Sequence, residues 1–212
     1  MIVYIDGFNL YFGLRDSGLR RCYWLDLRQL AVNLLLPGQQ LVFTKYFTAR
    51  ISGGMADDAP ARRTALDAKR KRQSNYLEAL ATLPDFRVYQ GHYLGKPVSC
   101  RSCGSSWRTH EEKMTDVQIA TELLLDAFND RFDTALIVSA DSDLLPPIRA
   151  VKAQFRGKRI VVGFPPGRNS VQLKKAAHAS FMVSTRVLEA SVFPDQVTKP
   201  DGFILRRPTQ WQ

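Results

Sequence analysis

The sequence predicts a single α/β domain with a mainly parallel sheet, and three observations lead to this fold class. Short apolar, β-branched segments alternate with amphipathic segments along the chain, which is typical of repeated strand–helix units. Residues 136–140 begin with branched apolar side chains on both faces, as in a strand at the centre of a parallel sheet. With 212 residues, 45% of them hydrophobic, the chain can form one substantial core.

The first part of the chain supplies two strands and a helix. Residues 2–5 are an apolar run that stops at Asp6, and the glycine that follows permits a sharp turn. Residues 8–12 then lead towards a loop rich in Gly, Arg and Ser. An aspartate caps a helix over 27–36, which a Pro-Gly pair ends, and residues 41–49 alternate as a second strand.

The middle of the chain adds two helices and a strand. A proline opens a long helix over 60–83, whose apolar residues are expected to form its inner face. Residues 86–93 alternate as a third strand. Thr115 and Gln118 have the spacing of a capping box, so a helix is expected over 115–128.

The last part of the chain continues the alternation. Two prolines fit the first turn of a helix over 146–155, which Gly157 ends, and 159–163 is another buried strand. A short helix, a short strand and a further helix follow, at residues 171–177, 181–183 and 184–190. We therefore expect one domain over 1–190, with an insert at about 94–110, and an irregular, basic tail over 191–212.

Acidic side chains gather where the predicted strands end. Because crossovers between parallel strands share one handedness, the carboxyl ends of the strands meet at one edge of the sheet. That edge collects Asp6, Asp141 and Asp143, and Asp116 at the start of a helix could approach it. Four aspartates suit Mg²⁺ or Mn²⁺, which prefer oxygen ligands. Taken singly, each acid also fits an ordinary turn or helix-cap position.

The charge of the chain points to a polyanionic partner. Its 30 Lys and Arg exceed its 20 Asp and Glu, which gives a net charge of +10 and a pI near 9.8. Such a surface favours nucleic acid, although a basic surface without a partner is the alternative.

No apolar run approaches the roughly 20 residues of a membrane span. The N-terminus has no secretion signal, and three cysteines form no disulfide framework, so we expect a cytoplasmic protein.

Three ordered motifs resemble those of NYN domains, which are PIN-like nucleases, and the LabA-like bacterial proteins are the most similar subgroup. The motifs are Ile5-Asp-Gly-Phe-Asn9, Lys113-Met-Thr-Asp116-Val and Ser139-Ala-Asp-Ser-Asp143-Leu-Leu-Pro. The resemblance covers about residues 1–185. It implies a three-layer α/β/α sandwich of PIN-like, Rossmann-like topology and metal-dependent cleavage of RNA. In this resemblance the acidic metal site comprises Asp6, Asp116, Asp141 and Asp143, with Asn9 and Ser139 as polar neighbours.

Two further groups of residues are candidates for binding. Basic side chains are candidates for contacts with RNA, single-stranded in the first instance, or are simply solvated; they are Arg62, Arg63, Lys69, Arg70, Lys71, Arg72, Arg168, Lys174 and Lys175. Cys100 and Cys103 could bind a structural Zn²⁺ with His92 and His110, or form a reduced turn or a redox-sensitive pair. Phe8, Tyr11 and Phe12 could stack on bases or belong to the core.

The leading functional hypothesis is a Mg²⁺- or Mn²⁺-dependent ribonuclease. The alternatives are a non-catalytic RNA-binding or regulatory protein of the same fold and a DNA nuclease. A phosphatase of the haloacid dehalogenase type would need Asp-x-Asp after the first strand, and neither a P-loop nor Gly-x-Gly-x-x-Gly follows a strand. The sequence leaves a homodimer open.

Overall fold

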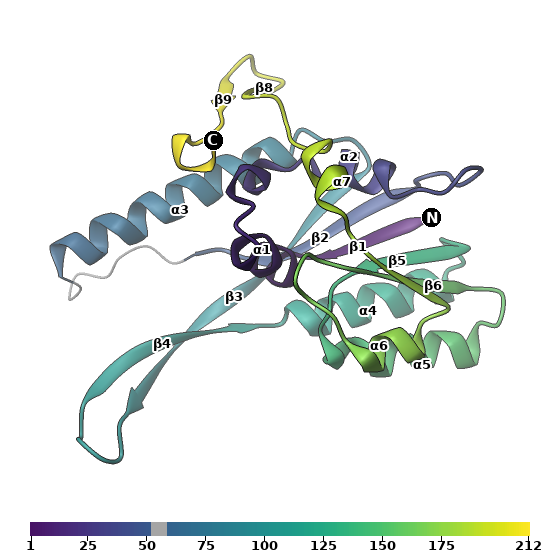
Figure 1. Cartoon of the computed structure of the whole chain (residues 1–212), viewed down its shortest axis with the longest axis horizontal. Helices are drawn as coiled ribbons and strands as arrows, with labels where there is room; N and C mark the ends of the chain where they lie inside the picture. Colours follow the sequence, from purple (N-terminus) through teal and green to yellow (C-terminus); the bar gives the residue numbers. More distant parts are fainter. Residues whose placement is uncertain (52–58) are drawn as a thin grey trace.

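The protein is an α/β domain built around a mainly parallel sheet, as the sequence predicts. The computed structural model describes residues 1–51 and 59–212, except for the side chains at 94, 96, 97 and 107–112. Figure 1 shows the sheet in the middle of the molecule, with helices on both sides and a long two-stranded arm leaving it.

Seven strands form the main sheet in the order β4-β3-β2-β1-β5-β6-β7. All neighbours pair in parallel except β3 and β4, which form an antiparallel hairpin. The strands are β1 (Ile2–Asp6), β2 (Phe43–Ala49), β3 (Phe86–Ser99), β4 (Ser106–Lys113), β5 (Thr134–Val138), β6 (Arg159–Phe164) and β7 (Ala179–Met182). In the register, Ile5 of β1 lies opposite Val138 of β5, so the chain leaves both strands side by side.

Helices cover both faces of the sheet. They are α1 (Gly7–Asp16), α2 (Leu27–Asn33), α3 (Pro60–Leu80), α4 (Thr115–Phe128), α5 (Leu145–Gln154), α6 (Val171–Ala176) and α7 (Thr185–Glu189). In the described residues, three 3-10 helices accompany them: η1 (Arg20–Trp24), η2 (Ser142–Leu144) and η3 (Thr209–Trp211). None of the helices in the described ranges is both long and apolar enough to cross a membrane.

The alternation of side chains along β1 divides the core in two. Val3 and Ile5 belong to the cluster under α1, α2, α3 and α7, whereas Ile2 and Tyr4 belong to the cluster under α4, α5 and α6. Both faces of the strand are therefore buried, as expected for a central parallel strand. The result is the three-layer α/β/α sandwich that the resemblance implies.

The structure corrects the prediction that residues 8–12 lead into a loop, because α1 begins directly after β1 and continues to Asp16. Two glycines inside α1 weaken its helix propensity, but both are required by close packing. A Cβ on Gly7 would lie 2.6 Å from the Phe47 carbonyl oxygen, and one on Gly13 would lie 2.8 Å from Pro165. The helix is thus selected by its tertiary contacts.

The first half of α3 and the β3–β4 hairpin project from the body of the domain (Figure 1). The apolar face predicted for α3 is buried only in the second half of the helix, at Leu77 and Leu80, whereas Ala65 and Ala68 in its first half are exposed. The insert predicted at about 94–110 is part of the antiparallel β3–β4 hairpin.

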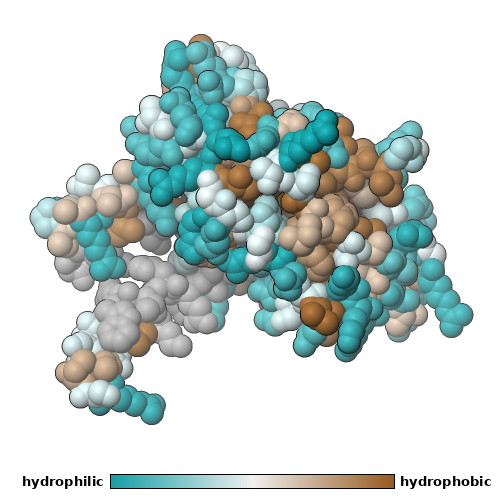
Figure 2. Space-filling model, viewed as in Figure 1, coloured by the Kyte–Doolittle hydropathy of each residue, from teal (hydrophilic) through white to brown (hydrophobic). Residues whose placement is uncertain are grey.

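In the same view, Figure 2 shows hydrophilic residues over much of the surface and hydrophobic colour mainly on its right-hand half.

The C-terminal segment has more structure than the irregular tail that the sequence predicts. It contains a small antiparallel pair, β8 (Gln196–Thr198) and β9 (Ile204–Arg206), followed by η3. Trp211 packs against the first core cluster and lies edge-on to the Tyr76 ring, with 6.0 Å between the ring centroids.

A buried ion pair network joins α4 to the sheet. The Lys45 ammonium on β2 is 2.6 Å from a Glu122 carboxylate oxygen and 2.5 Å from one of Asp126. The Tyr4 hydroxyl donates to Asp126 at 2.6 Å, and the Tyr89 hydroxyl donates to Glu122 at 2.8 Å. Lys45 and Asp126 are only 3% and 2% exposed, so neither charge has bulk water as a substitute partner.

We predict that Lys45→Met destabilises the fold by about 3–5 kcal/mol, because it removes the nearest counter-charge of the buried Asp126 carboxylate, whose other cationic partner, the exposed Arg131, is 3.6 Å away. Urea unfolding followed by circular dichroism measures the change. The control is Lys174→Met, which removes an exposed lysine and should change stability by less than about 0.5 kcal/mol. Similar stability of the two variants would contradict the role of Lys45.

Candidate active site

The carboxylate of Asp6 lies buried where β1 meets α1. Its Oδ1 accepts hydrogen bonds from the backbone N–H groups of Phe8 and Asn9, both at 3.0 Å. Its Oδ2 accepts from Asn9 Nδ2 at 2.7 Å and from the Ser139 hydroxyl at 2.8 Å. An ionised carboxylate has about four acceptor positions, so these donors occupy them all. Asp6 therefore serves as the N-cap of α1, and its hydrogen bond with Ser139 connects it to the end of the neighbouring strand β5.

Asn9 and Ser139 connect this carboxylate to the loop that follows β5. Ser139 is fully buried, and its hydroxyl also accepts a hydrogen bond from the Asp141 backbone N–H at 3.0 Å. Asn9 Oδ1 accepts from the Ala140 backbone N–H at 3.3 Å. Both side chains act as donor and acceptor, and together they fix the backbone of the loop relative to α1.

Asp141 and Asp143 stand on the outer side of this network. The Asp141 carboxylate caps η2 by accepting from the Asp143 backbone N–H at 2.9 Å. Asp141 is partly exposed and Asp143 is exposed. These two carboxylates, unlike that of Asp6, are open to a solute at the carboxyl edge of the sheet.

Burial and a neighbouring negative charge disfavour the ionised form of the Asp6 carboxyl group. Burial raises the pKa of its carboxyl group, and the nearby Asp141 raises this pKa further. The hydrogen bonds from Asn9 and Ser139 act in the opposite direction because they stabilise the ionised form. Additional negative charge at this edge is therefore unfavourable, and a cation there would be favourable.

Asp116 lies at the same edge of the sheet. It is in the first turn of α4 and is partly exposed. Lys113, which precedes it, pairs with His92 beyond the end of the parallel part of β3, so α4 starts at the carboxyl edge. The helix also packs against β1 and η2. Within the described ranges, however, no three His, Cys, Asp or Glu side chains form a ready-made metal cluster.

Comparison with known proteins fits this geometry. The model of the NYN domain family matches residues 1–185, which is most of the chain. The chain belongs to the NYN domain family.

Two relatives add detail to this assignment. The NYN domain protein is 30% identical to 6-hydroxy-3-succinoylpyridine 3-monooxygenase of Pseudomonas putida over 83% of its own length, and it spans 64% of that relative. A crystal structure of a Vibrio parahaemolyticus protein of unknown function has a TM-score of 0.51 at 18% identity. The match covers 87% of this chain and 93% of the other, which shows a shared fold. Membership of the NYN family suggests a nuclease-like function related to RNA.

The basic candidates of the NYN domain occupy three places. Six lie on the projecting half of α3, where all are exposed except Arg72, which is half-buried; they are Arg62, Arg63, Lys69, Arg70, Lys71 and Arg72. Arg168 follows β6 and pairs with Asp16 at 2.6 Å. Lys174 and Lys175 are exposed on α6. The α3 group is thus the largest of the three, and all of its members lie on one helix.

The cysteine pair lies at the tip of the β3–β4 hairpin, away from the acidic edge. Cys103 Sγ is 3.2 Å from the Ser105 hydroxyl, and hydrogen bonds from Ser105 and then Cys100 lower the pKa of Cys103 to about 7. His92 precedes Cys100 by eight residues of the extended hairpin, roughly 25 Å away. The prediction that His92 completes a zinc site with the pair is therefore wrong. The side chain of His110 lies outside the described residues.

A cavity of about 550 Å³ lies beside the acidic edge, between α1 and α3. Sequence reasoning missed it because its wall comes from segments as distant as Phe8 and Trp211. Tyr11 and Phe8, which the sequence left open between stacking and core positions, line this cavity and are only partly buried. In the sequence, the signal for this cavity is the number of aromatic and basic side chains in the first 25 residues.

We predict that Asp6→Ala destabilises the NYN domain by about 2 kcal/mol or more, because it removes a helix cap and leaves buried donors without an acceptor. Thermal and urea unfolding measure the loss. Asp143→Ala is the control, since an exposed side chain at the same edge should contribute less than about 1 kcal/mol. Equal effects of the two variants would mean that the buried network does not organise this edge.

We also predict that Cys103 reacts with iodoacetamide with a midpoint near pH 7, because its pKa is lowered to about 7 and the thiolate is the nucleophile. Peptide mass spectrometry after timed alkylation at several pH values measures this midpoint. Ser105→Ala should shift it upwards by removing the main stabilising hydrogen bond. Buried Cys22, whose pKa is raised by burial, should remain unmodified in the folded protein.

Proposed function

We propose that this NYN domain protein is a Mg²⁺- or Mn²⁺-dependent ribonuclease that hydrolyses single-stranded RNA at its acidic edge. The observation that carries the proposal is the pair of accessible carboxylates, Asp141 and Asp143, on a loop that the buried Asp6 network holds in place. A strongly basic protein that orders acidic side chains at one edge has the charge pattern that a metal-assisted reaction on a polyanion needs.

The side chains at this edge fit a hard divalent cation. Mg²⁺ is commonly held by one or two carboxylates, with waters and substrate phosphate oxygens completing its coordination. Asp141 and Asp143 would hold it, and Asp116 at the start of α4 is the third candidate. We assign Asp6 a positioning role, because its oxygens already accept four hydrogen bonds. When bound, such a cation neutralises phosphate charge and favours ionisation of the attacking water.

The residues of the chain have separate tasks in this proposal. Asn9 and Ser139 keep the loop in register with α1, so the two outer carboxylates stay at a fixed separation. In this proposal Asp143, the more exposed of the two, would also accept a proton from water as a general base. Lysines and arginines bind the RNA phosphates and set the direction of the strand. The three free cysteines support a reducing, cytoplasmic setting, and the three motifs support the LabA-like subgroup.

A second candidate function is the conversion of a small aromatic acid. It is favoured by the name of the Pseudomonas putida relative, of which this chain spans 64%, and by the aromatic cavity beside the acidic edge. Loss of a hydroxypyridine carboxylic acid in the presence of O₂ and a two-electron donor would support it. RNA that stays intact under the conditions of the assay below would support it further.

We predict that Asp141→Asn and Asp143→Asn each reduce Mn²⁺-dependent cleavage of a labelled single-stranded RNA to background while the fold remains intact. Each substitution removes a negative charge and a ligand at the open side of the edge. Gel analysis of the cleavage products measures activity, with EDTA as the metal control. Single-stranded DNA and duplex RNA in parallel distinguish a ribonuclease from a DNA nuclease.

The matched control is Asp133→Asn, which makes the same change just before β5, at the opposite edge of the sheet, and should cleave like the wild type. Equal cleavage by the wild type and both edge variants would contradict the proposal. If no protein cleaves RNA but the edge variants bind it more tightly, the protein is a non-catalytic RNA-binding module, because the acids then only repel the phosphates.

A further inference from the structure

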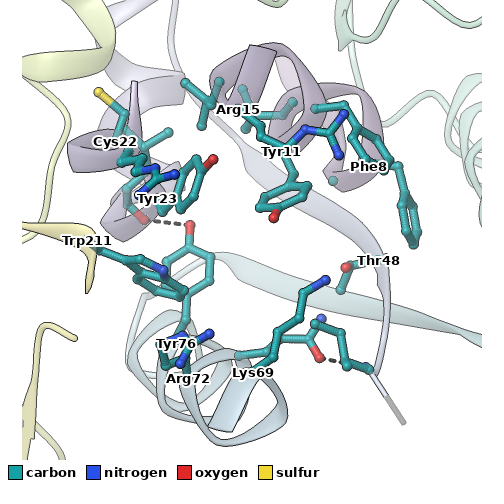
Figure 3. Close-up of a pocket in the computed structure, with 18 of the residues that line it drawn as sticks. Phe8, Tyr11, Arg15, Cys22, Tyr23, Thr48, Lys69, Arg72, Tyr76 and Trp211 are labelled. Atoms are coloured by element: carbon teal, nitrogen blue, oxygen red, sulfur yellow. Dashed lines mark hydrogen bonds between the residues drawn. The ribbon is translucent and has the colours of Figure 1, made fainter. Parts of the chain in front are cut away.

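The cavity between α1 and α3 has walls of unusual composition. Partly buried aromatic side chains from four separate elements surround it, namely Phe8, Tyr11, Tyr23, Tyr76 and Trp211. Figure 3 shows these rings around one open space, with α1 on one side and α3 on the other. Its volume of about 550 Å³ falls within the roughly 300–1,000 Å³ that is usual for sites binding small ligands.

The rings pack against one another in a way that leaves some of their surface free. The Tyr11 and Tyr23 centroids are 5.2 Å apart, and Tyr23 meets Trp211 edge-on at 5.9 Å. The Tyr76 hydroxyl is held in place by a hydrogen bond that it donates to the Leu25 carbonyl oxygen at 2.8 Å. Such tilted and edge-on contacts hold the rings in place, while their half-exposed surfaces can stack on another planar ring.

The charged side chains of the cavity are all cationic among its described lining residues. They are Arg15, Arg20, Lys69 and Arg72. Arg15 is partly neutralised by Asp16 at 2.9 Å. Lys69 and Arg72 make no ion pair within the ranges that the structure describes, and Figure 3 shows Lys69 extending towards the space beneath Tyr11. An anion would therefore meet positive charge in the cavity without competition from a carboxylate.

We propose that this cavity binds a planar aromatic ring that carries a negatively charged group, with the ring stacked on Tyr11 and Tyr23 and the charge beside Lys69 and Arg72. Two sources provide this chemistry, namely one nucleotide of a single-stranded RNA and a free aromatic carboxylate. The exposed basic run continues along α3 beyond the cavity, which would accommodate the further phosphates of an RNA strand.

The cavity and the acidic edge are neighbours with different side chains. The Phe8 backbone N–H donates to Asp6 at 3.0 Å, whereas the Phe8 ring lines the cavity and lies 5.9 Å from the Tyr93 ring. A ligand in the cavity would thus lie next to the acidic edge without occupying it. The inference does not require that edge to be catalytic, so either proposal can fail alone.

Isothermal titration calorimetry with four probes tests the inference on the full chain. The probes are uridine 5′-monophosphate, pyridine-3-carboxylate, uridine and inorganic phosphate. We expect at least one of the two anionic rings to bind about tenfold more tightly than both uridine and phosphate. Binding of the nucleotide alone identifies RNA as the source, and binding of the carboxylate alone identifies a free aromatic acid.

Two variants locate the binding in the cavity. Tyr11→Leu should weaken binding of the preferred probe about tenfold by removing a stacking surface, and Lys69→Met should weaken it similarly by removing the cation. Arg186→Met is the control for loss of an exposed cation outside the cavity and should bind like the wild type. Each variant is first checked for an unchanged melting temperature. The inference is overturned if neither anionic ring binds, if all four probes bind equally, or if well-folded Tyr11 and Lys69 variants bind like the wild type.

Discussion

The hydrogen bonding of the buried Asp6 carboxylate is the interaction on which the candidate site depends. A charge that is 1% exposed survives in a protein only when its oxygens are fully satisfied. Here the donors come from the first turn of α1 and from Ser139 after β5. One side chain therefore ends a strand, starts a helix and fixes the neighbouring loop, so the edge is ordered before any ligand arrives.

This arrangement divides the acids into two kinds. The oxygens of Asp6 are used in hydrogen bonds that hold the backbone, whereas Asp141 and Asp143 are exposed to water in part or in full. The repulsion between Asp6 and Asp141, seen in the raised pKa of Asp6, is a cost that a bound cation would relieve. In the proposed function the surplus of basic residues elsewhere has a different purpose, which is to attract a polyanion that the acids alone would repel.

The sequence predicts those parts of the structure that depend on local pattern. The buried strands and the acids at their ends follow from β-branched runs and from the handedness of crossovers, which act over short segments. Helix α1 was not predictable in this way, because Gly7 and Gly13 lower its propensity and are explained only by atoms of Phe47 and Pro165. The hydrogen bonds of Asn9 and Ser139 likewise appear only when the start of α1 and the loop after β5, which are 131 residues apart between Asn9 and Ala140, come together in the fold.

Helix α1 links the two functional proposals physically. Its first turn donates backbone hydrogen bonds to Asp6, and its side chains Phe8 and Tyr11 line the aromatic cavity. Gly7 lets the helix lie against β2 so closely that a single added carbon would force the two apart. Because the helix cannot shift on one side without moving donors on the other, a ring that packs against Tyr11 bears on the same rigid element that positions the acidic edge. Helix α1 is therefore the element that the two proposals share.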